Sequence, residues 1–153
     1  MRSINLIVIH CSAVPNGRPQ TTADINGWHH ALGMRRTAEF MARQNEALDA
    51  IGYHFIILLN GAVATGRHID EVGDHVRGRD QKSIGICLIG TDQFTLAQWS
   101  SLRYNVTLLR AAYPEARVVG HRDIPHAHKT SPGFDVTAWL AGDMAPPAGH
   151  VLP

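Results

Sequence analysis

The chain has 153 residues, a length that fits one domain built around a single hydrophobic core. Apolar residues make up 44% and charged residues 18%, and the formal net charge of +1 gives no electrostatic case for binding nucleic acid or membrane. No run approaches the roughly 20 apolar residues of a membrane helix, and the apolar run 4–9 is too short for a signal peptide.

Hydrophobic periodicity divides the chain into alternating short strands and helices. In chain order, the predicted elements are strand 4–9, helix 22–32, helix 37–50, strands 53–59 and 62–67, strand 83–89, helix 96–112, strand 117–120 and a last helix from Asp135 through Trp139. Strands apolar on both faces belong to a sheet that is covered on both sides. The pattern therefore predicts an α/β fold, a single domain with a mixed central sheet flanked by helices, and a frayed C-terminal tail over 146–153.

Short-range signals fix two of these boundaries. Asn60-Gly61 is the strongest short hairpin signal and predicts that strands 53–59 and 62–67 pair. Thr95 with Gln98 forms a capping box, and Phe94 with Trp99 fits a hydrophobic staple, so the longest helix should begin there.

The helices predicted over 37–50 and 96–112 are expected to pack on the faces of the sheet. In the helix predicted over 22–32, Ile25, Trp28 and Leu32 stand three and four residues apart and should form its apolar face. Residues 68–81 are polar and contain glycine, and we expect them to form a loop over the functional site.

Two histidines each follow an apolar, β-branched run. His10 follows strand 4–9, and His121 follows strand 117–120 in the stretch Gly120-His121-Arg122-Asp123. A histidine at a strand end is, taken singly, more often structural than a ligand. Together, two neutral imidazoles supply half of a zinc site, and a catalytic zinc needs three protein ligands and one open position for water.

The remaining motifs carry a resemblance. They are IVIHCSA at 7–13, IGYHFIILLNGAVATGR at 51–67, KSIGICLIG at 82–90, VVGHRDI at 118–124 and KTSPGFDV at 129–136. In this order and spacing, the chain resembles the zinc-dependent N-acetylmuramoyl-L-alanine amidases, the family of the small T-odd phage lysozymes and the peptidoglycan-recognition proteins. The resemblance covers nearly the whole chain and implies an amidase catalytic domain over 1–145.

The resemblance also implies a site. It makes zinc the cofactor, His10 and His121 two of its ligands, and Ser131 the occupant of the third ligand position. Tyr53 and Lys129 would belong to the catalytic centre, and His75 would line the substrate groove. The alternatives without a catalytic role are that Tyr53 is a core aromatic and that Lys129 and His75 are surface residues.

Ser131 departs from the family pattern, which has Cys or Asp at this position. A serine hydroxyl is neutral at pH 7 and a far weaker ligand than a thiolate or carboxylate. Either the protein is catalytically weakened, or the serine replaces a parental cysteine, or another group such as His126, His128 or Asp135 completes the site. For Asp135, capping the last helix is the favoured role.

The two cysteines are expected to be buried free thiols, since they are too few for a disulfide framework. Cys11 and Cys87 both lie in apolar runs. Cys87 stands where some amidases of the family carry a glutamate base, a role that a thiol fills poorly.

The function implied is cleavage of the amide between N-acetylmuramic acid and L-alanine of peptidoglycan. The resemblance favours a phage or prophage endolysin, a monomer that collects in the host cytoplasm and reaches the wall after membrane permeabilisation. The alternative is a peptidoglycan-binding protein without activity, which Ser131 would favour.

Overall fold

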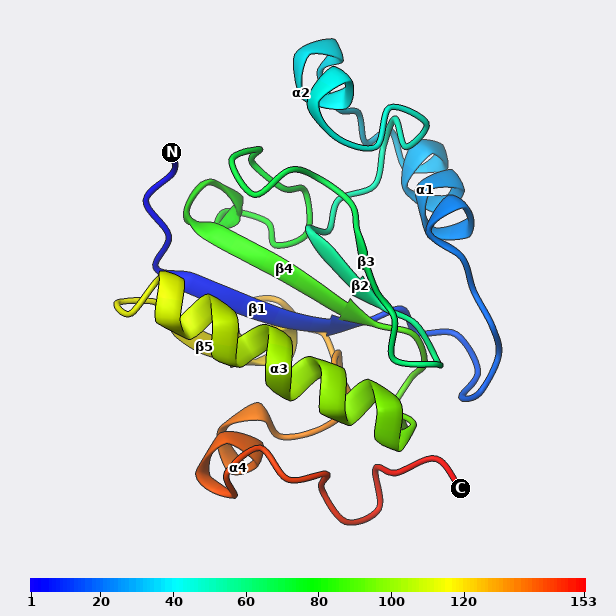
Figure 1. The fold of residues 1–153 in the computed structure, drawn as a ribbon, viewed down its shortest axis with the longest axis vertical. Coiled ribbons are helices and arrows are strands. Elements are labelled where there is room, and N and C mark those ends of the chain that lie inside the picture. Colours follow the sequence, from blue (N-terminus) through cyan, green and yellow to red (C-terminus); the bar gives the residue numbers. More distant parts are fainter.

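Five strands form one mixed sheet at the centre of the computed structural model, which describes residues 1–153 (Figure 1). They are β1 (Leu6–Cys11), β2 (Phe55–Ile57), β3 (Val63–Thr65), β4 (Ser83–Leu88) and β5 (Arg117–Gly120). The order across the sheet is β3-β2-β4-β1-β5, with parallel neighbours except for the antiparallel β2–β3 hairpin. The predicted mixed sheet and the predicted hairpin are confirmed, with strand ends displaced by up to two residues.

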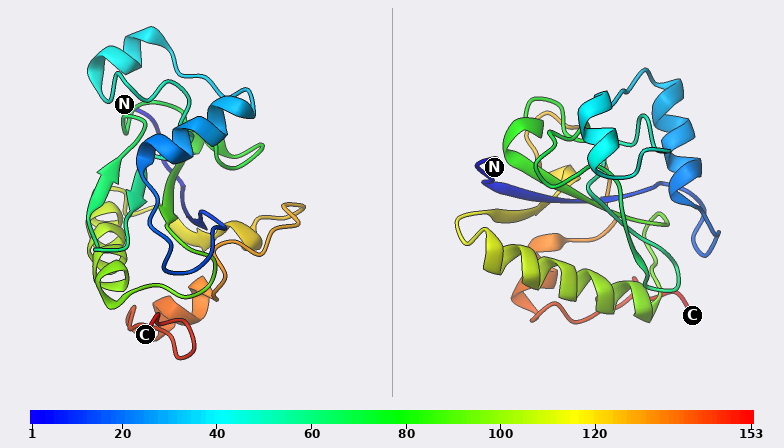
Figure 2. Two further views of the ribbon diagram at one scale, coloured as in Figure 1. Left: turned by 90° about the vertical axis from the view of Figure 1, so that its right-hand side faces the viewer. Right: turned by 45° about the horizontal axis from the view of Figure 1, so that its top comes forward.

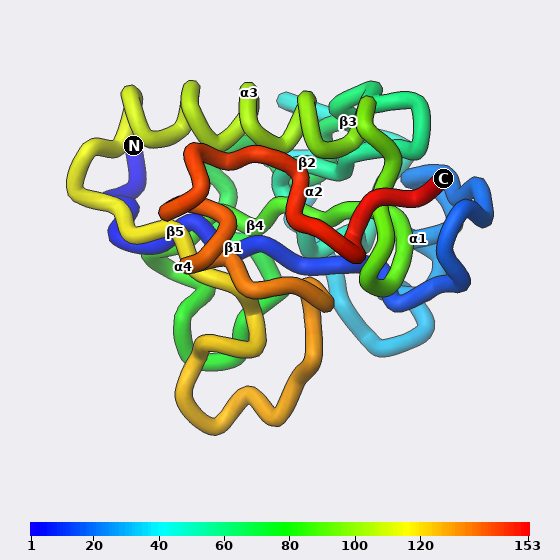
Figure 3. The backbone as a smooth tube through the Cα atoms, turned by 90° about the horizontal axis from the view of Figure 1, so that it is seen from below, coloured from blue at the N-terminus to red at the C-terminus, as the bar shows by residue number.

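The structure has four helices: α1 (Thr22–Ala31), α2 (Ala38–Arg43), α3 (Leu96–Ala112) and α4 (Val136–Ala141). Two 3₁₀ turns, η1 (Asp80–Lys82) and η2 (His121–Asp123), follow the loop after β3 and strand β5. Figures 2 and 3 show α3 and α4 on one side of the sheet, and the segment after β5 projecting from the other side. None of the helices combines the length and the apolar character that crossing a bilayer requires.

Alternation along β1 separates a hydrophobic face from the face that carries the candidate site. Ile7, Ile9 and Cys11 belong to the main core cluster, which includes side chains of α3 and α4. Because successive side chains of a strand point to opposite faces, His10 lies on the other side of the sheet. The hydrophobic packing of β1 on α3 and α4 thus fixes where His10 points.

The start of α3 is as predicted. The Thr95 side chain accepts from the Gln98 backbone N–H, and the Gln98 side chain accepts in return from the Thr95 N–H. The rings of Phe94 and Trp99 pack edge to face with centroids 5.6 Å apart. Local sequence was sufficient here because both devices involve residues at most five positions apart.

The helix predicted over 37–50 is shorter, and the prediction that it packs on the sheet is wrong. It ends at Arg43 and buries no residue. The chain leaves the helical conformation at Gln44, which is extended with φ −160° and ψ 130°, and the carbonyls of Gln44, Asn45 and Leu48 accept from the Arg36 guanidinium instead. Asn45 also has a left-handed backbone, with φ 55°. An extended residue followed by a left-handed one ends the helix, and the carbonyls beyond it are satisfied by Arg36.

The predicted apolar face of α1 is wrong in part. Ile25 is buried, but Trp28 is 43% and Leu32 74% exposed. The second buried position is His29, whose Nδ1 accepts from the Gly52 N–H at 2.8 Å. This polar anchor turns Ile25 and His29 inward and leaves the larger apolar side chains outside.

The C-terminal tail is docked rather than frayed. Val151 forms an isolated β-bridge with Phe94, and the His150 carbonyl accepts from the indole N–H of Trp99. The tail's backbone groups are therefore paired with the start of α3, which its Pro- and Gly-rich composition did not reveal.

Candidate active site

His10 and His121 meet at one edge of the sheet. β1 and β5 are parallel neighbours, and Ile9 pairs with Gly120, so the next residue of each chain segment is a histidine. The two rings lie edge to face with centroids 4.5 Å apart. The register of β1 with β5 thus brings together two histidines that are more than a hundred residues apart in the sequence, as predicted.

Ser131 lies beside this pair. Its Oγ accepts from the Cys11 backbone N–H at 3.0 Å, and its carbonyl accepts from the Arg122 N–H at 2.7 Å. These two bonds attach Ser131 to the residues that directly follow His10 and His121. The predicted third ligand position therefore adjoins the two histidines.

Tyr53 and Lys129 line the same cleft, whose volume is about 890 Å³. The Tyr53 ring lies 5.1 Å from that of His10, between centroids. Burial raises the pKa of the Tyr53 phenol well above its ordinary value of 10.0, so the phenol stays protonated. Burial lowers the pKa of His121, and the positive charge of the exposed Lys129 lowers it further.

His75 lies at the floor of the cleft, with its side chain fully buried. Its Nδ1 is 2.8 Å from His10 Nε2, and its Nε2 is 3.1 Å from the Ser83 hydroxyl. The alternative that His75 is a surface residue is wrong. The expected contact with substrate stays a prediction.

The histidines of the site are neutral at neutral pH. Burial lowers the pKa of His10 and of His75 well below 6.5, and neighbouring histidines lower both further. Burial, then the Lys129 charge, lowers the pKa of His121. Neutral imidazole is the form that binds a metal.

Comparison with known proteins decides the family. Residues 1–134 match the sequence profile of the N-acetylmuramoyl-L-alanine amidases. The endolysin of Enterobacteria phage K11 is 35% identical over 140 residues, which cover 86% of this chain and 82% of the relative. The chain belongs to the N-acetylmuramoyl-L-alanine amidase family.

Solved structures agree on the fold of this amidase. The endolysin amidase LysCS from Clostridium intestinale superposes with a TM-score of 0.74 at 24% identity, covering 94% of this chain and 84% of that one. Drosophila PGRP-LB gives a TM-score of 0.68 at 20% identity, covering 99% and 85%. These likenesses show that the amidase has the fold shared by this endolysin amidase and this peptidoglycan-recognition protein.

The amidase does not bring a replacement for Ser131 to the two histidines. No group of three His, Cys, Asp or Glu side chains converges as a metal site. His126 lines the cleft but is exposed, His128 is exposed and does not line it, and Asp135 accepts from the Ala138 N–H as the cap of α4. The favoured capping role of Asp135 is confirmed.

Both cysteines of the amidase are buried and free, as predicted. Cys87 stands opposite His10 in the β1–β4 register. Burial raises the pKa of the Cys87 thiol, so it stays protonated and does not act as the base that a glutamate would provide.

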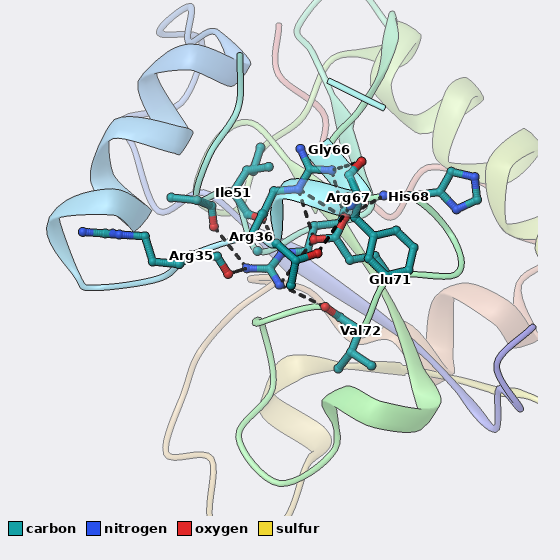
Figure 4. Close-up of polar contacts among 12 residues, drawn as sticks. Arg35, Arg36, Ile51, Gly66, Arg67, His68, Glu71 and Val72 are labelled. Carbon is teal, nitrogen blue, oxygen red and sulfur yellow. Dashed lines mark hydrogen bonds and ion pairs between the residues drawn. The ribbon is translucent and has the colours of Figure 1, made fainter. Parts of the chain in front are cut away.

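Sequence reasoning missed a buried ion network behind the cleft. Figure 4 shows Arg36 and Arg67 around Glu71. The Arg67 guanidinium also donates to the carbonyls of Arg35 and Ile51, and so fixes the segments on either side of α2. Met34, which precedes Arg36 in the sequence by two residues, lines the cleft. The only sequence signal was the presence of charged residues beside apolar ones, which does not identify partners.

Proposed function

We propose that this amidase binds zinc through His10, His121 and Ser131 and cleaves the amide between N-acetylmuramic acid and L-alanine in peptidoglycan. The observation that carries the proposal is the pair of neutral imidazoles at the shared carboxyl end of β1 and β5. Two of the three donors fit zinc well, because neutral imidazole is a preferred ligand, whereas the neutral hydroxyl is a weak one.

When bound, zinc would supply a Lewis acid that polarises the amide carbonyl and lowers the pKa of a water toward ~7. The Lys129 ammonium would stabilise the negative charge that develops on the carbonyl oxygen. The Tyr53 phenol, protonated because it is buried, would donate a hydrogen bond or a proton as the stem-peptide amine leaves.

Ser131 separates this proposal from its alternative, a protein that binds peptidoglycan without cutting it. The hydroxyl carries no charge, so zinc should be held more loosely than by a cysteine thiolate at the same place. Tyr53 and Lys129 both line the cleft, which supports an enzyme, because binding alone does not require a proton donor and a cation beside the metal.

The biological setting that we propose is lysis of a Gram-negative host from within. The K11 relative is an endolysin of an enterobacterial phage. The chain would act as a monomer, collect in the host cytoplasm and reach the wall once the membrane is permeabilised. Peptidoglycan is its proposed substrate and partner.

The test combines zinc content with lysis. Zinc per chain is measured by elemental analysis after purification without chelator, and lysis by the turbidity of outer-membrane-permeabilised Gram-negative cells. We expect zinc and lysis in this chain, and loss of both in His121→Ala. His128→Ala is the matched control, an exposed histidine of the same loop that does not line the cleft.

Two outcomes would overturn the proposal. Absence of zinc from this chain even with zinc in excess would remove the metal site. Zinc at full occupancy with no lysis would favour the binding protein over the enzyme.

A further inference from the structure

A neutral histidine that binds a metal through one ring nitrogen needs its other nitrogen fixed by a hydrogen bond. For His10, the structure identifies that partner. His10 Nε2 lies 2.8 Å from His75 Nδ1, and the two rings are edge to face with centroids 5.0 Å apart. His10 Nδ1 has no hydrogen-bond partner within the chain, and His10 lines the cleft.

The His75 ring occupies a narrow slot between two glycines. A Cβ on Gly73 would lie 2.7 Å from His75 Cδ2, and a Cβ on Gly85 would lie 2.7 Å from His75 Nδ1. Any larger residue at either position would displace the ring. The backbone of the slot is also held, because the His75 and Val76 N–H groups both donate to Asp80 Oδ1 at 2.8 Å.

The surroundings of His75 favour one tautomer. Its Nε2 lies 3.1 Å from the Ser83 hydroxyl and 3.8 Å from the Asp80 carboxylate, whose negative charge favours a proton on that nitrogen. The Ser83 hydroxyl can donate onward to the Asp80 carbonyl, 3.5 Å away. His75 Nδ1 is then the unprotonated nitrogen and accepts from the N–H at His10 Nε2. This leaves His10 Nδ1 without a proton and available to a metal.

We propose that His75 is a positioning residue that sets the tautomer of His10, so that His10 binds zinc through Nδ1. The opposite arrangement, with His75 Nδ1 as donor, would put a proton on His10 Nδ1 and block that ligand. This inference rests on the zinc site proposed above. It gives His75 a role inside the metal site, distinct from the contact with substrate that the sequence suggested.

The test measures zinc affinity by competition with a chromophoric chelator, in this chain and in its Ser131→Cys variant. His75→Leu removes the acceptor, and we expect zinc affinity to fall about 10- to 100-fold in both backgrounds. His75→Asn places an amide oxygen near the position of Nδ1 and should recover most of that loss. A residue that only fills space would not show this difference between Leu and Asn.

The matched control is His54→Asn. His54 is a second buried imidazole, 5.8 Å from the His75 ring between centroids, but its bonds go to Gly85, Glu71 and Arg2 rather than to His10. We expect zinc affinity to stay within about twofold of the parent chain. Melting temperatures in chelator show whether each variant is folded.

A second measurement needs no substitution. Nitrogen-15 NMR of the zinc-loaded protein distinguishes a protonated Nε2 from a metal-bound Nδ1 in each histidine ring. We expect a proton on Nε2 of His10. A His10 bound to zinc through Nε2, or a folded His75→Leu variant that binds zinc as tightly as its parent, would overturn the inference alone. If neither parent binds zinc, the proposed metal site fails, and the role of His75 fails with it.

Discussion

The buried carboxylate of Glu71 should contribute strongly to the stability of this amidase. It accepts from the Arg36 guanidinium at 2.9–3.2 Å and lies 3.7 Å from Arg67 (Figure 4). The exposed fractions of the side chains are 5% for Glu71, 0% for Arg36 and 7% for Arg67. Glu71→Gln keeps the shape but leaves two guanidinium groups buried without their carboxylate.

The magnitude follows from this burial. Removing one partner of a buried ion pair costs about 3–5 kcal/mol, because the remaining charge loses its compensation. For a chain of this size, 1 kcal/mol corresponds to about 2–4 °C of melting temperature. Glu71→Gln should therefore melt roughly 6–20 °C lower, a large part of the total stability of an ordinary domain.

Thermal melting and urea unfolding provide the assay, with Asp70→Asn as the matched control. Asp70 is the preceding residue and pairs with Arg43 at 3.5 Å, but these side chains are 31% and 45% exposed. An exposed pair contributes ~0–1 kcal/mol. If the two variants lose similar stability, or if Glu71→Gln loses less than about 1 kcal/mol, burial is not what makes this pair matter.

Three further predictions concern the metal, pH and a helix cap. Ser131→Cys should raise zinc affinity, lytic activity and the zinc-dependent rise in melting temperature together, because a thiolate adds charge and a soft donor. Equal zinc content by elemental analysis and equal lysis in the turbidity assay would show that Ser131 is not a defect. Burial lowers the pKa of His54 to about 4, against 6.5 ordinarily, so the unfolded chain takes up this proton first. The contribution of His54 to stability is then complete above pH 6.5 and lost as the pH falls toward 4; in urea unfolding with chelator, His54→Asn should flatten this decline by up to ~1.4 kcal/mol per pH unit, and an unchanged slope would contradict the assignment. Thr95→Ala should cost ~1 kcal/mol in the same unfolding assay, because the Gln98 N–H loses its acceptor, whereas Thr95→Ser should cost clearly less.

Local sequence was sufficient wherever the deciding contacts are local. The capping box of Thr95 and Gln98 fixed the start of α3, and Asn60-Gly61 fixed the β2–β3 hairpin. It failed for the helix predicted over 37–50, because the chain leaves the helical conformation at Gln44 and turns its following carbonyls toward Arg36. A guanidinium that binds the carbonyls of a later segment leaves no periodic signal in the sequence.

The sequence by itself determined the strands, the order of the family motifs and the two histidines that follow β-branched runs. Parallel pairing of β1 with β5 then brought His10 to His121, as strand register requires. Only the tertiary structure decided that His75 is buried against His10 Nε2 and that Gly73 and Gly85 leave a slot for its ring. The physical reason is that such contacts depend on the ångström-scale approach of three separate segments, and hydrophobic periodicity carries information only about which face of a segment is buried.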